Sequence, residues 1–311
     1  MATLWPWRID GRHEFAFTRQ PVGLLAGWGD YPLVIARALK RQSYEVYCLG
    51  LKGYASEELA DICDDFQWKG MCKVGGSIRY FRRHGVRVAT MAGKYPKLKL
   101  FQPLAFLKNL PDWRAVRRFA PLILARRGNL KDDTLLTELL AEFALDGIEF
   151  RPPTDFVPEV LVQYGQLTHR GPSDVQRKDI QFGWEVAKEL GRLDIGQTVV
   201  VKNRAVLAVE AIEGTDECIR RAGQLCRGGG FTVVKVAKPQ QDMRFDVPTI
   251  GRQTLENIVR CGGRVLAVEA GKTIIVNQSE VLDLAERHRL IVVALRQDGQ
   301  CELPAAESSA A

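Results

Sequence analysis

The residues best suited to phosphate chemistry lie in one short loop, from Lys238 to Thr249. Carboxylates bind hard cations such as Mg²⁺, and basic side chains neutralise the charge on phosphate oxygens. A further carboxylate can orient an attacking water. The loop carries two prolines and these polar residues: Lys238, Gln240, Gln241, Asp242, Arg244, Asp246 and Thr249. It predicts a phosphoryl-transfer site, and a surface loop held by salt bridges is the alternative of comparable weight.

A second candidate is the stretch from Glu210 to Asp216, which follows a predicted strand and leads into a predicted helix. The helix N-terminus after Gly214 could receive a phosphate, and Glu213 or Asp216 could help to bind a metal. The simpler interpretation is helix capping, with Thr215 as the cap and Asp216 in the first turn. Capping explains Asp216 and leaves Glu213 unexplained.

The six residues from Val206 to Ala211 recur without change from Val265 to Ala270. Each copy ends a predicted strand with a carboxylate, Glu210 in the first and Glu269 in the second. The repeat is either a coincidence between two similarly buried strands or a device that brings both carboxylates to one edge of a sheet. Two copies are too few for a solenoid.

A glycine-rich turn follows the first predicted strand, with Gly27, Gly29 and Asp30 before a helix that Pro32 opens. Backbone amides in such a turn can approach a phosphate, and Asp30 is also a plausible helix cap. The dinucleotide motif G-x-G-x-x-G is incomplete, because Pro32 replaces its last glycine. A tight turn alone would explain the pattern, and a nicotinamide-dependent enzyme is disfavoured.

The order of predicted elements indicates two α/β domains. Strand, turn, helix and strand over 22–49 open a Rossmann-like unit, and a later strand over 86–91 leads to Lys94. The second half predicts two strands within 198–210 that meet at a Lys-Asn turn, and then alternating helices and strands to residue 295. We therefore expect an α/β fold, with a Rossmann-like N-terminal domain and a distinct C-terminal α/β domain that contains a mixed sheet. The predicted boundaries are 1–20 for an N-terminal extension, 21–150 for the Rossmann-like domain, 151–172 for a proline-rich linker, 173–300 for the catalytic domain and 301–311 for a tail.

The chain carries a net charge of +7, and residues 97–127 contain eight basic residues against one aspartate. Bulky apolar residues alternate with these charges, which suits an anionic membrane surface or a lipid better than a nucleic acid. A core helix with a solvated face is the alternative. The seven cysteines form no C-x-x-C pair and indicate reduced thiols. No segment predicts a signal peptide or a membrane span.

Other catalytic patterns are missing. The four histidines are isolated, and the sequence lacks a G-x-S-x-G elbow, a phosphate-binding P-loop and zinc-ligand spacing. Metal chemistry, if present, must therefore rest on carboxylates.

Five segments together resemble the UDP-2,3-diacylglucosamine pyrophosphatases of lipid A synthesis. They are Gly23–Pro32, Gly191–Val200, Val206–Asp216, Lys238–Gly251 and Val265–Gly271. The similarity runs in the same order from Pro21 to Leu295.

This resemblance implies Mg²⁺-dependent hydrolysis of UDP-2,3-diacylglucosamine to UMP and 2,3-diacylglucosamine 1-phosphate, with the substrate held between the two domains. It implies that Asp246, in the Asp-x-Pro-Thr stretch, is the essential residue that binds metal or positions water. Asp242 is expected as a second metal ligand, and Asp242 and Lys238 as catalytic neighbours. The residues expected to bind substrate are Gly27, Gly29, Asp30, Lys94, Glu213, Thr215, Asp216, Gln241, Arg244 and Thr249.

The expected setting is cytoplasmic, with peripheral contact at the inner membrane, a lipid-linked UDP-sugar as substrate, no nucleic acid and a possible homo-oligomer. Two alternatives stay open: a non-catalytic protein that binds a nucleotide-linked lipid, and an oxidoreductase that uses a nicotinamide cofactor. Release of UMP would exclude the first, and failure to bind NAD would exclude the second.

Overall fold

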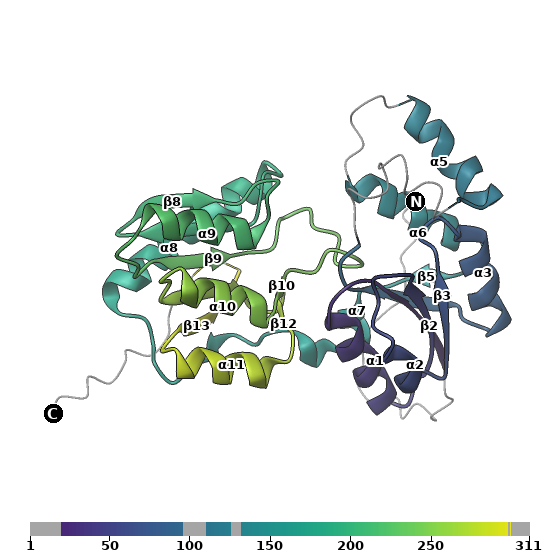
Figure 1. The fold of residues 1–311 in the computed structure, drawn as a ribbon, viewed down its shortest axis with the longest axis horizontal. Coiled ribbons are helices and arrows are strands. Elements are labelled where there is room, and N and C mark those ends of the chain that lie inside the picture. Colours follow the sequence, from purple (N-terminus) through teal and green to yellow (C-terminus); the bar gives the residue numbers. More distant parts are fainter. Residues whose placement is uncertain (1–19, 96–109, 126–131, 298, 300–311) are drawn as a thin grey trace, which may run out of the picture.

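The fold consists of two α/β domains joined by an ordered connection (Figure 1). The computed structural model describes residues 20–95, 110–125, 132–297 and 299, without the side chains of 122–125 and 132–134. The predicted N-terminal extension (apart from residue 20), the predicted tail and much of the basic segment 97–127 lie outside these ranges.

The N-terminal domain is built on a five-stranded parallel sheet in the order β3-β2-β1-β4-β5. This order is typical of a Rossmann-like sheet, and it confirms the predicted fold class. The elements are β1 (Pro21–Ala26), α1 (Tyr31–Arg41), β2 (Glu45–Leu51), α2 (Leu59–Ile62), β3 (Asp65–Lys69), α3 (Val74–Arg83), β4 (Val88–Ala92), α5 (Trp113–Ala125), α6 (Asp132–Ala144) and β5 (Glu149–Phe150).

Two apolar clusters cover the two faces of this sheet. Residues of α1 and α2 pack with Leu24 and Cys48 on one face, and residues of α3, α5 and α6 pack with Leu49 and Met91 on the other. The strand patterns alternate between these faces, as the geometry of a sheet requires. The result is three layers, with the carboxyl ends of all five strands at one edge.

The sequence pattern did not predict any element between residues 49 and 86, where the structure has α2, β3 and α3. Strand β3 lies at the edge of the sheet and is largely exposed, so it lacks the buried apolar run that marks a central strand. Helix α3 begins with Val74-Gly75-Gly76, and glycine lowers helix propensity.

The proline-rich stretch 151–172 connects the two domains and is itself structured. It forms α7 (Pro153–Phe156), η2 (Pro158–Val160) and β6 (Gly165–Gln166). Val157 is buried in the N-terminal domain, and β6 pairs with the sheet of the C-terminal domain. The connection is therefore anchored at both ends.

The C-terminal domain is built on a six-stranded mixed sheet in the order β6-β13-β11-β9-β7-β8. Strands β9, β11 and β13 are parallel, whereas β6, β7 and β8 each run antiparallel to a neighbour. The elements are α8 (Asp174–Arg192), β7 (Thr198–Lys202), β8 (Ala205–Val209), α9 (Thr215–Leu225), β9 (Thr232–Lys235), β10 (Thr249–Ile250), α10 (Arg252–Arg260), β11 (Val265–Glu269), β12 (Ile274–Ile275), α11 (Gln278–Arg287) and β13 (Ile291–Leu295).

Helix α8 covers one face of this sheet, and α9, α10 and α11 cover the other. The turn between β7 and β8 has positive φ at Asn203 and Arg204, which suits a two-residue hairpin. Helix α8 begins with a capping box, in which Ser173 accepts from the Gln176 amide and the Gln176 side chain accepts from the Ser173 amide.

Side chains from the C-terminal domain are part of the N-terminal core. Ile274 and Val276 are buried in the cluster beneath α1, and Val247 packs against it. Phe245 packs against the cluster on the opposite face of the same sheet. The loop 238–249 therefore crosses an edge of the N-terminal sheet, as its path in Figure 1 indicates.

Candidate active site

A buried lysine, Lys235, stands at the centre of the polar groups that the two domains bring together. It is the last residue of β9, and only 6% of its surface is exposed. Its Nζ donates to Thr215 Oγ1 at 3.1 Å and to the Thr249 carbonyl at 3.2 Å. The charged groups that act on Lys235 come from β8, α9, the loop 238–249 and the N-terminal domain: Glu210, Asp216, Asp246 and Lys94.

Burial lowers the pKa of the Lys235 ammonium below its ordinary value. The charge on Glu210 opposes this shift, and the positive charge on Lys94 adds to it. Lys94 follows β4, whereas Lys235 ends β9. Ala92, the last residue of β4, is buried with Ile274, and Ile274 pairs with Thr249, whose carbonyl accepts from Lys235. The carboxyl ends of strands from the two domains thus lie near each other, which is where α/β sheets usually bind ligands.

Thr215 links Lys235 to Glu210. Its hydroxyl accepts from Lys235 and donates to Glu210 Oε1 at 3.1 Å, and Thr198 Oγ1 lies 3.3 Å away. The predicted capping role of Thr215 is wrong: the N-cap is Gly214, with φ of 84°, and helix α9 begins at Thr215. The Thr215 hydroxyl instead belongs to a buried network.

The two other acids near α9 are bound to neighbouring side chains. Asp216 Oδ1 accepts from Thr254 Oγ1 at 3.0 Å, which ties α9 to α10. Glu213 forms an ion pair with Arg221 at 2.7 Å and accepts from the Ala211 amide. The charge on Asp216 thus favours the protonated form of Lys235. Glu213 instead stabilises the turn between β8 and α9.

Gln241 organises the polar loop around Asp246. Its Nε2 donates to Asp246 Oδ2 at 3.0 Å, and its Oε1 accepts from the Lys238 amide at 2.9 Å. The Lys238 ammonium forms an ion pair with Asp194 at 3.0 Å. Asp246 is therefore held in place near Lys235, while the Lys238 side chain reaches the turn after α8.

Asp242 and Arg244 form a bidentate ion pair within the loop: Arg244 Nε donates to Asp242 Oδ1 at 2.9 Å, and Nη2 donates to Oδ2 at 2.6 Å. Burial opposes ionisation of Asp242, but the hydrogen bonds from Arg244 outweigh it, and the pKa of Asp242 is lowered. For Asp242, this ion pair agrees with the alternative that 238–249 is a surface loop held by salt bridges. Its role as a second metal ligand stays a prediction.

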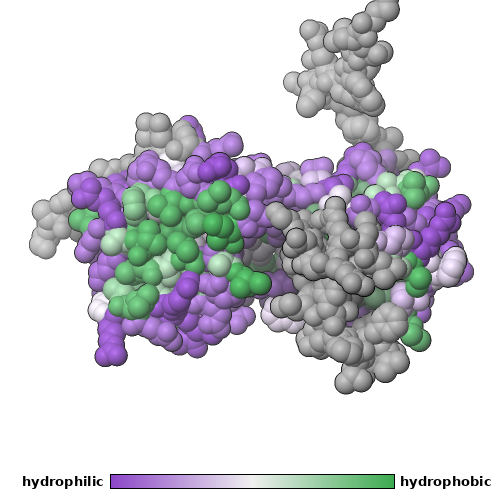
Figure 2. Space-filling view, turned by 90° about the horizontal axis from the view of Figure 1, so that it is seen from above, coloured by the Kyte–Doolittle hydropathy of each residue, from purple (hydrophilic) through white to green (hydrophobic). Residues whose placement is uncertain are grey.

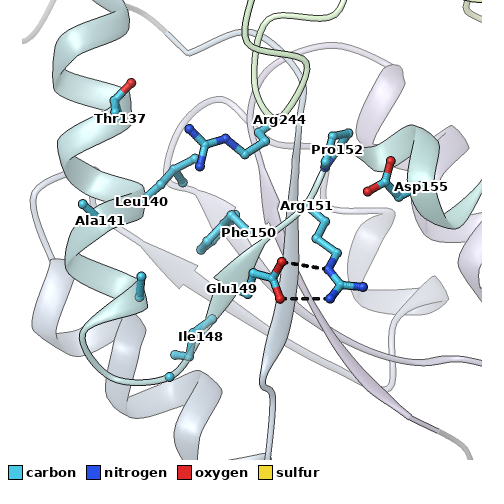
Figure 3. Close-up of a pocket in the computed structure, with 12 residues that line it drawn as sticks. Thr137, Leu140, Ala141, Ile148, Glu149, Phe150, Arg151, Pro152, Asp155 and Arg244 are labelled. Carbon is cyan, nitrogen blue, oxygen red and sulfur yellow. Dashed lines mark hydrogen bonds and ion pairs between the residues drawn. The ribbon is translucent and has the colours of Figure 1, made fainter. Parts of the chain in front are cut away.

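Arg244 extends from this loop over the N-terminal domain and lines a cavity of about 630 Å³ (Figure 3). The cavity has an apolar side formed by α6 and the start of β5. Its apolar lining residues are Leu140, Ala141, Ala144, Ile148 and Phe150. At the other side Arg151 is paired with Glu149. Neither Lys235 nor Asp246 lines this cavity, and Arg244 is the lining residue that comes from the loop 238–249.

The glycine-rich turn contacts the segment that carries Lys94. The amides of Gly27 and Trp28 donate to the carbonyls of Ala92 and Lys94, so both are already used within the chain. A Cβ on Gly27 would lie 2.7 Å from the Lys94 carbonyl oxygen, which explains the glycine. Gly29 has φ of 102°, and Asp30 precedes α1 without a capping hydrogen bond from its side chain. This turn positions Lys94, whose Nζ lies 5.5 Å from the centre of the Trp28 ring.

The two carboxylates of the repeated hexapeptide reach the same edge of the C-terminal sheet, on opposite faces. Glu210 follows β8 and faces α9, where its Oε2 is buried without a partner among the described residues. Glu269 ends β11 and faces α8, where it pairs with Lys188 at 2.6 Å. Glu210 therefore belongs to the Lys235 network, and Glu269 stabilises the other side of the sheet.

No group of three or more His, Cys, Asp or Glu side chains is arranged to hold a metal within the described ranges. Mg²⁺, however, is usually bound through one or two carboxylates together with substrate phosphates and waters. Asp246 suits such a site, because Gln241 orients its carboxylate and its charge acts at Lys235.

Comparisons with known proteins identify the family. Residues 21–160 match the LpxI N-terminal domain, and residues 163–293 match the LpxI C-terminal domain. This chain belongs to the LpxI family. Its two domains meet at residues 160–163, within the ordered connection.

A relative in the LpxI family is the UDP-2,3-diacylglucosamine pyrophosphatase LpxI of Caulobacter vibrioides. It is 32% identical over 286 residues, which cover 88% of this chain and 97% of the relative. A solved structure, the biotin carboxylase domain of the Hydrogenobacter thermophilus 2-oxoglutarate carboxylase, is 11% identical. That match covers 67% of this chain and 41% of the other, and its TM-score of 0.22 supports no conclusion about this LpxI chain.

Within the described residues, no helix of this LpxI chain is long and apolar enough to cross a membrane. Sequence reasoning missed Lys235 as a site residue. The available signal was a charged residue at the end of an otherwise apolar buried strand, Thr232-Val-Val-Lys235. Such a position is unusual for lysine unless it is functional or paired.

Proposed function

We propose that this LpxI chain hydrolyses the pyrophosphate bond of UDP-2,3-diacylglucosamine, which releases UMP and 2,3-diacylglucosamine 1-phosphate. The observation that carries the proposal is the match to both LpxI domains, together with a relative of that printed activity aligned over 97% of its length. The site supports it, because Thr215 and the Thr249 carbonyl hold Lys235 where the charges of Lys94 and of three carboxylates also act.

The reaction needs a water to attack one phosphorus while the bridging P–O bond breaks. The bridging oxygen leaves on the other phosphate, and a base accepts the proton of the water. Asp246 is the residue that we assign to orienting this water or to binding Mg²⁺. Bound Mg²⁺ would neutralise diphosphate charge and act as a Lewis acid.

The lipid half of the substrate needs apolar surface next to the diphosphate. The cavity beside Arg244 supplies an apolar wall on α6, and the loop that carries Arg244 also carries Asp246. We propose that acyl chains of the substrate enter this cavity.

We further propose peripheral contact with the inner face of the inner membrane. The basic and apolar sequence of 97–127 supports this contact. Further support comes from Figure 2, which shows a hydrophobic patch on the C-terminal domain. This patch lies on the side of the domain where Figure 1 labels β8 and α9. Val206 of β8 is 41% exposed, and Ile212 in the following turn is 99% exposed.

The decisive experiment is incubation of the purified protein with UDP-2,3-diacylglucosamine, with Mg²⁺ or with EDTA, followed by product identification. We expect UMP and 2,3-diacylglucosamine 1-phosphate with Mg²⁺, and a large loss of both with EDTA. Intact substrate in both arms would reject the proposed hydrolysis. Equal turnover in both arms would reject only the metal requirement.

A further inference from the structure

We infer that Lys235 and Lys94 bracket the substrate diphosphate from the two domains, and that Thr215 and Glu210 hold Lys235 in position. The inference rests on the proposed function for the identity of the ligand. The positions and partners of the two lysines carry the rest of the argument.

The first observation is the kind of partner that Lys235 has. Burying a charge is costly unless a counter-charge or strong hydrogen bonds compensate. The Nζ of Lys235 donates to a hydroxyl and a carbonyl, and it forms no ion pair with a carboxylate of the described residues. Neighbouring cations differ: Lys238 pairs with Asp194, Arg244 with Asp242, Arg221 with Glu213, and Lys188 with Glu269.

The second observation is the number of donors. An ammonium group carries three N–H donors, and two acceptors are present within the described residues. Lys235 therefore keeps a donor for an incoming oxygen. Since the residue is 6% exposed and ends a rigid strand, that donor is fixed in direction.

The third observation is the approach of two like charges. Ala92, two residues before Lys94, is buried in the same cluster as Ile274, and Ile274 pairs with Thr249, whose carbonyl accepts from Lys235. The positive charge on Lys94 accordingly opposes protonation of Lys235. Two cations brought together by separate domains repel one another, and an anion between them reverses the sign of this interaction. A diphosphate carries more than one negative charge and can contact both lysines.

The fourth observation is the support behind Lys235. Thr215 donates its hydroxyl hydrogen to Glu210 Oε1, so a lone pair of Thr215 Oγ1 is directed at the ammonium. Glu210 thus fixes the orientation of Thr215, and it favours the charged form of Lys235. Glu210 is a positioning residue, because it acts through Thr215 and through its charge.

The test compares full-length Lys235→Met and Lys94→Met with the wild type. Two measurements are made: kcat/KM for UDP-2,3-diacylglucosamine, and the Kd of UDP by calorimetry. We expect Lys235→Met to lower kcat/KM by about 100-fold or more, within the range known for loss of a transition-state contact. The Kd of UDP should rise by about tenfold in each variant, by the strength of a charge-assisted hydrogen bond. Lys235→Arg should recover part of the activity, because it retains the charge.

Lys202→Met is the matched control. Lys202 is a half-buried lysine of the same sheet at the opposite edge, where it donates to the Gly229 carbonyl at 2.5 Å. It should bind UDP as the wild type does. A second matched pair tests the support: Thr215→Ser keeps the hydroxyl and should retain most activity, whereas Thr215→Val removes it and should weaken UDP binding.

A folded Lys235→Met that binds UDP and turns over substrate like the wild type would overturn the inference. If Lys235→Met does not fold, the Kd of UDP for Lys94→Met tests the inference, because Lys94 is exposed. An unchanged Kd in that variant would reject the proposal that both lysines contact the diphosphate. If the wild type releases no UMP, the proposed function fails, but the UDP measurements still test the diphosphate contact. Weaker UDP binding by both variants than by the wild type then supports that contact. Equal binding by the variants and the wild type, or no UDP binding by the wild type, rejects it.

Discussion

At the residue scale, the site depends on a few side chains whose direction is fixed by a hydrogen bond. Asp246 is held by Gln241, and Lys235 is held by Thr215 and the Thr249 carbonyl. Such positioning reduces the reorganisation needed when charge develops in the reaction. The two residues also come from different parts of the chain, a loop and a strand end.

Asp246→Asn should lower kcat by about 100-fold or more while the fold persists, because the substitution removes the charge and keeps the shape. Circular dichroism and the melting temperature should match the wild type. A titration with Mg²⁺ separates the two roles of Asp246. A raised Mg²⁺ requirement with recovered kcat indicates metal binding, and a low kcat at saturating Mg²⁺ indicates orientation of water. Undiminished turnover at ordinary Mg²⁺ would contradict both assignments.

The sequence predicted part of this site. Asp246 and Gln241 lie in a loop whose density of polar residues is visible without a structure, and Lys94 follows a recognisable strand. Lys235 was missed because its partners are distant in sequence: Thr215 is 20 residues away, and Glu210 approaches only through Thr215. Thr215 also has the sequence context of a helix cap, so local rules gave it another role.

At the element scale, the loop 238–249 carries the proposed catalytic residue Asp246 together with internal salt bridges. The salt-bridge interpretation holds for Asp242, which pairs with Arg244. The catalytic interpretation of Asp246 stays a prediction, and its charge acts on Lys235. The two strands predicted within 198–210 are β7 and β8, and helices and strands alternate to residue 295 as the pattern predicts. The two-residue strand β10 and the edge elements β3 and β6 have too few buried residues to leave a periodic signal.

Asp242→Asn should destabilise the protein in a pH-dependent way. The pKa of Asp242 is lowered in the folded state, so its contribution is fully present above the unfolded value near 3.8. It is lost as the pH falls through that value towards the lower folded pKa. Because the pair is partly exposed, the melting temperature should drop by less than about 3 °C at pH 7. Thermal melts from pH 7 to pH 3 check this, and a difference that grows towards pH 3 would contradict the assignment.

At the scale of the whole molecule, the two domains share apolar cores as well as a site. Adjacent residues of β12 face different domains: Ile274 is buried in the N-terminal cluster beneath α1, and Ile275 is buried in the C-terminal cluster. Val157 from the connection also lies in the N-terminal cluster. These contacts fix the separation of Lys94 and Lys235, on which the proposed diphosphate site depends.

Ile274→Ala and Ile275→Ala therefore form a matched pair that separates domain coupling from stability. Each removes the same atoms from a buried position and should cost about 2–5 kcal/mol. The wild type should unfold in one calorimetric transition, because neither domain can expose its shared core alone. Ile274→Ala should split that transition into two. It should also lower kcat/KM at temperatures below the first of these transitions, because Lys94 and Lys235 are no longer held at a fixed distance. Ile275→Ala should lower the single transition and leave kcat/KM nearly unchanged, and identical behaviour of the two variants would show that the packing between the domains does not hold the site together.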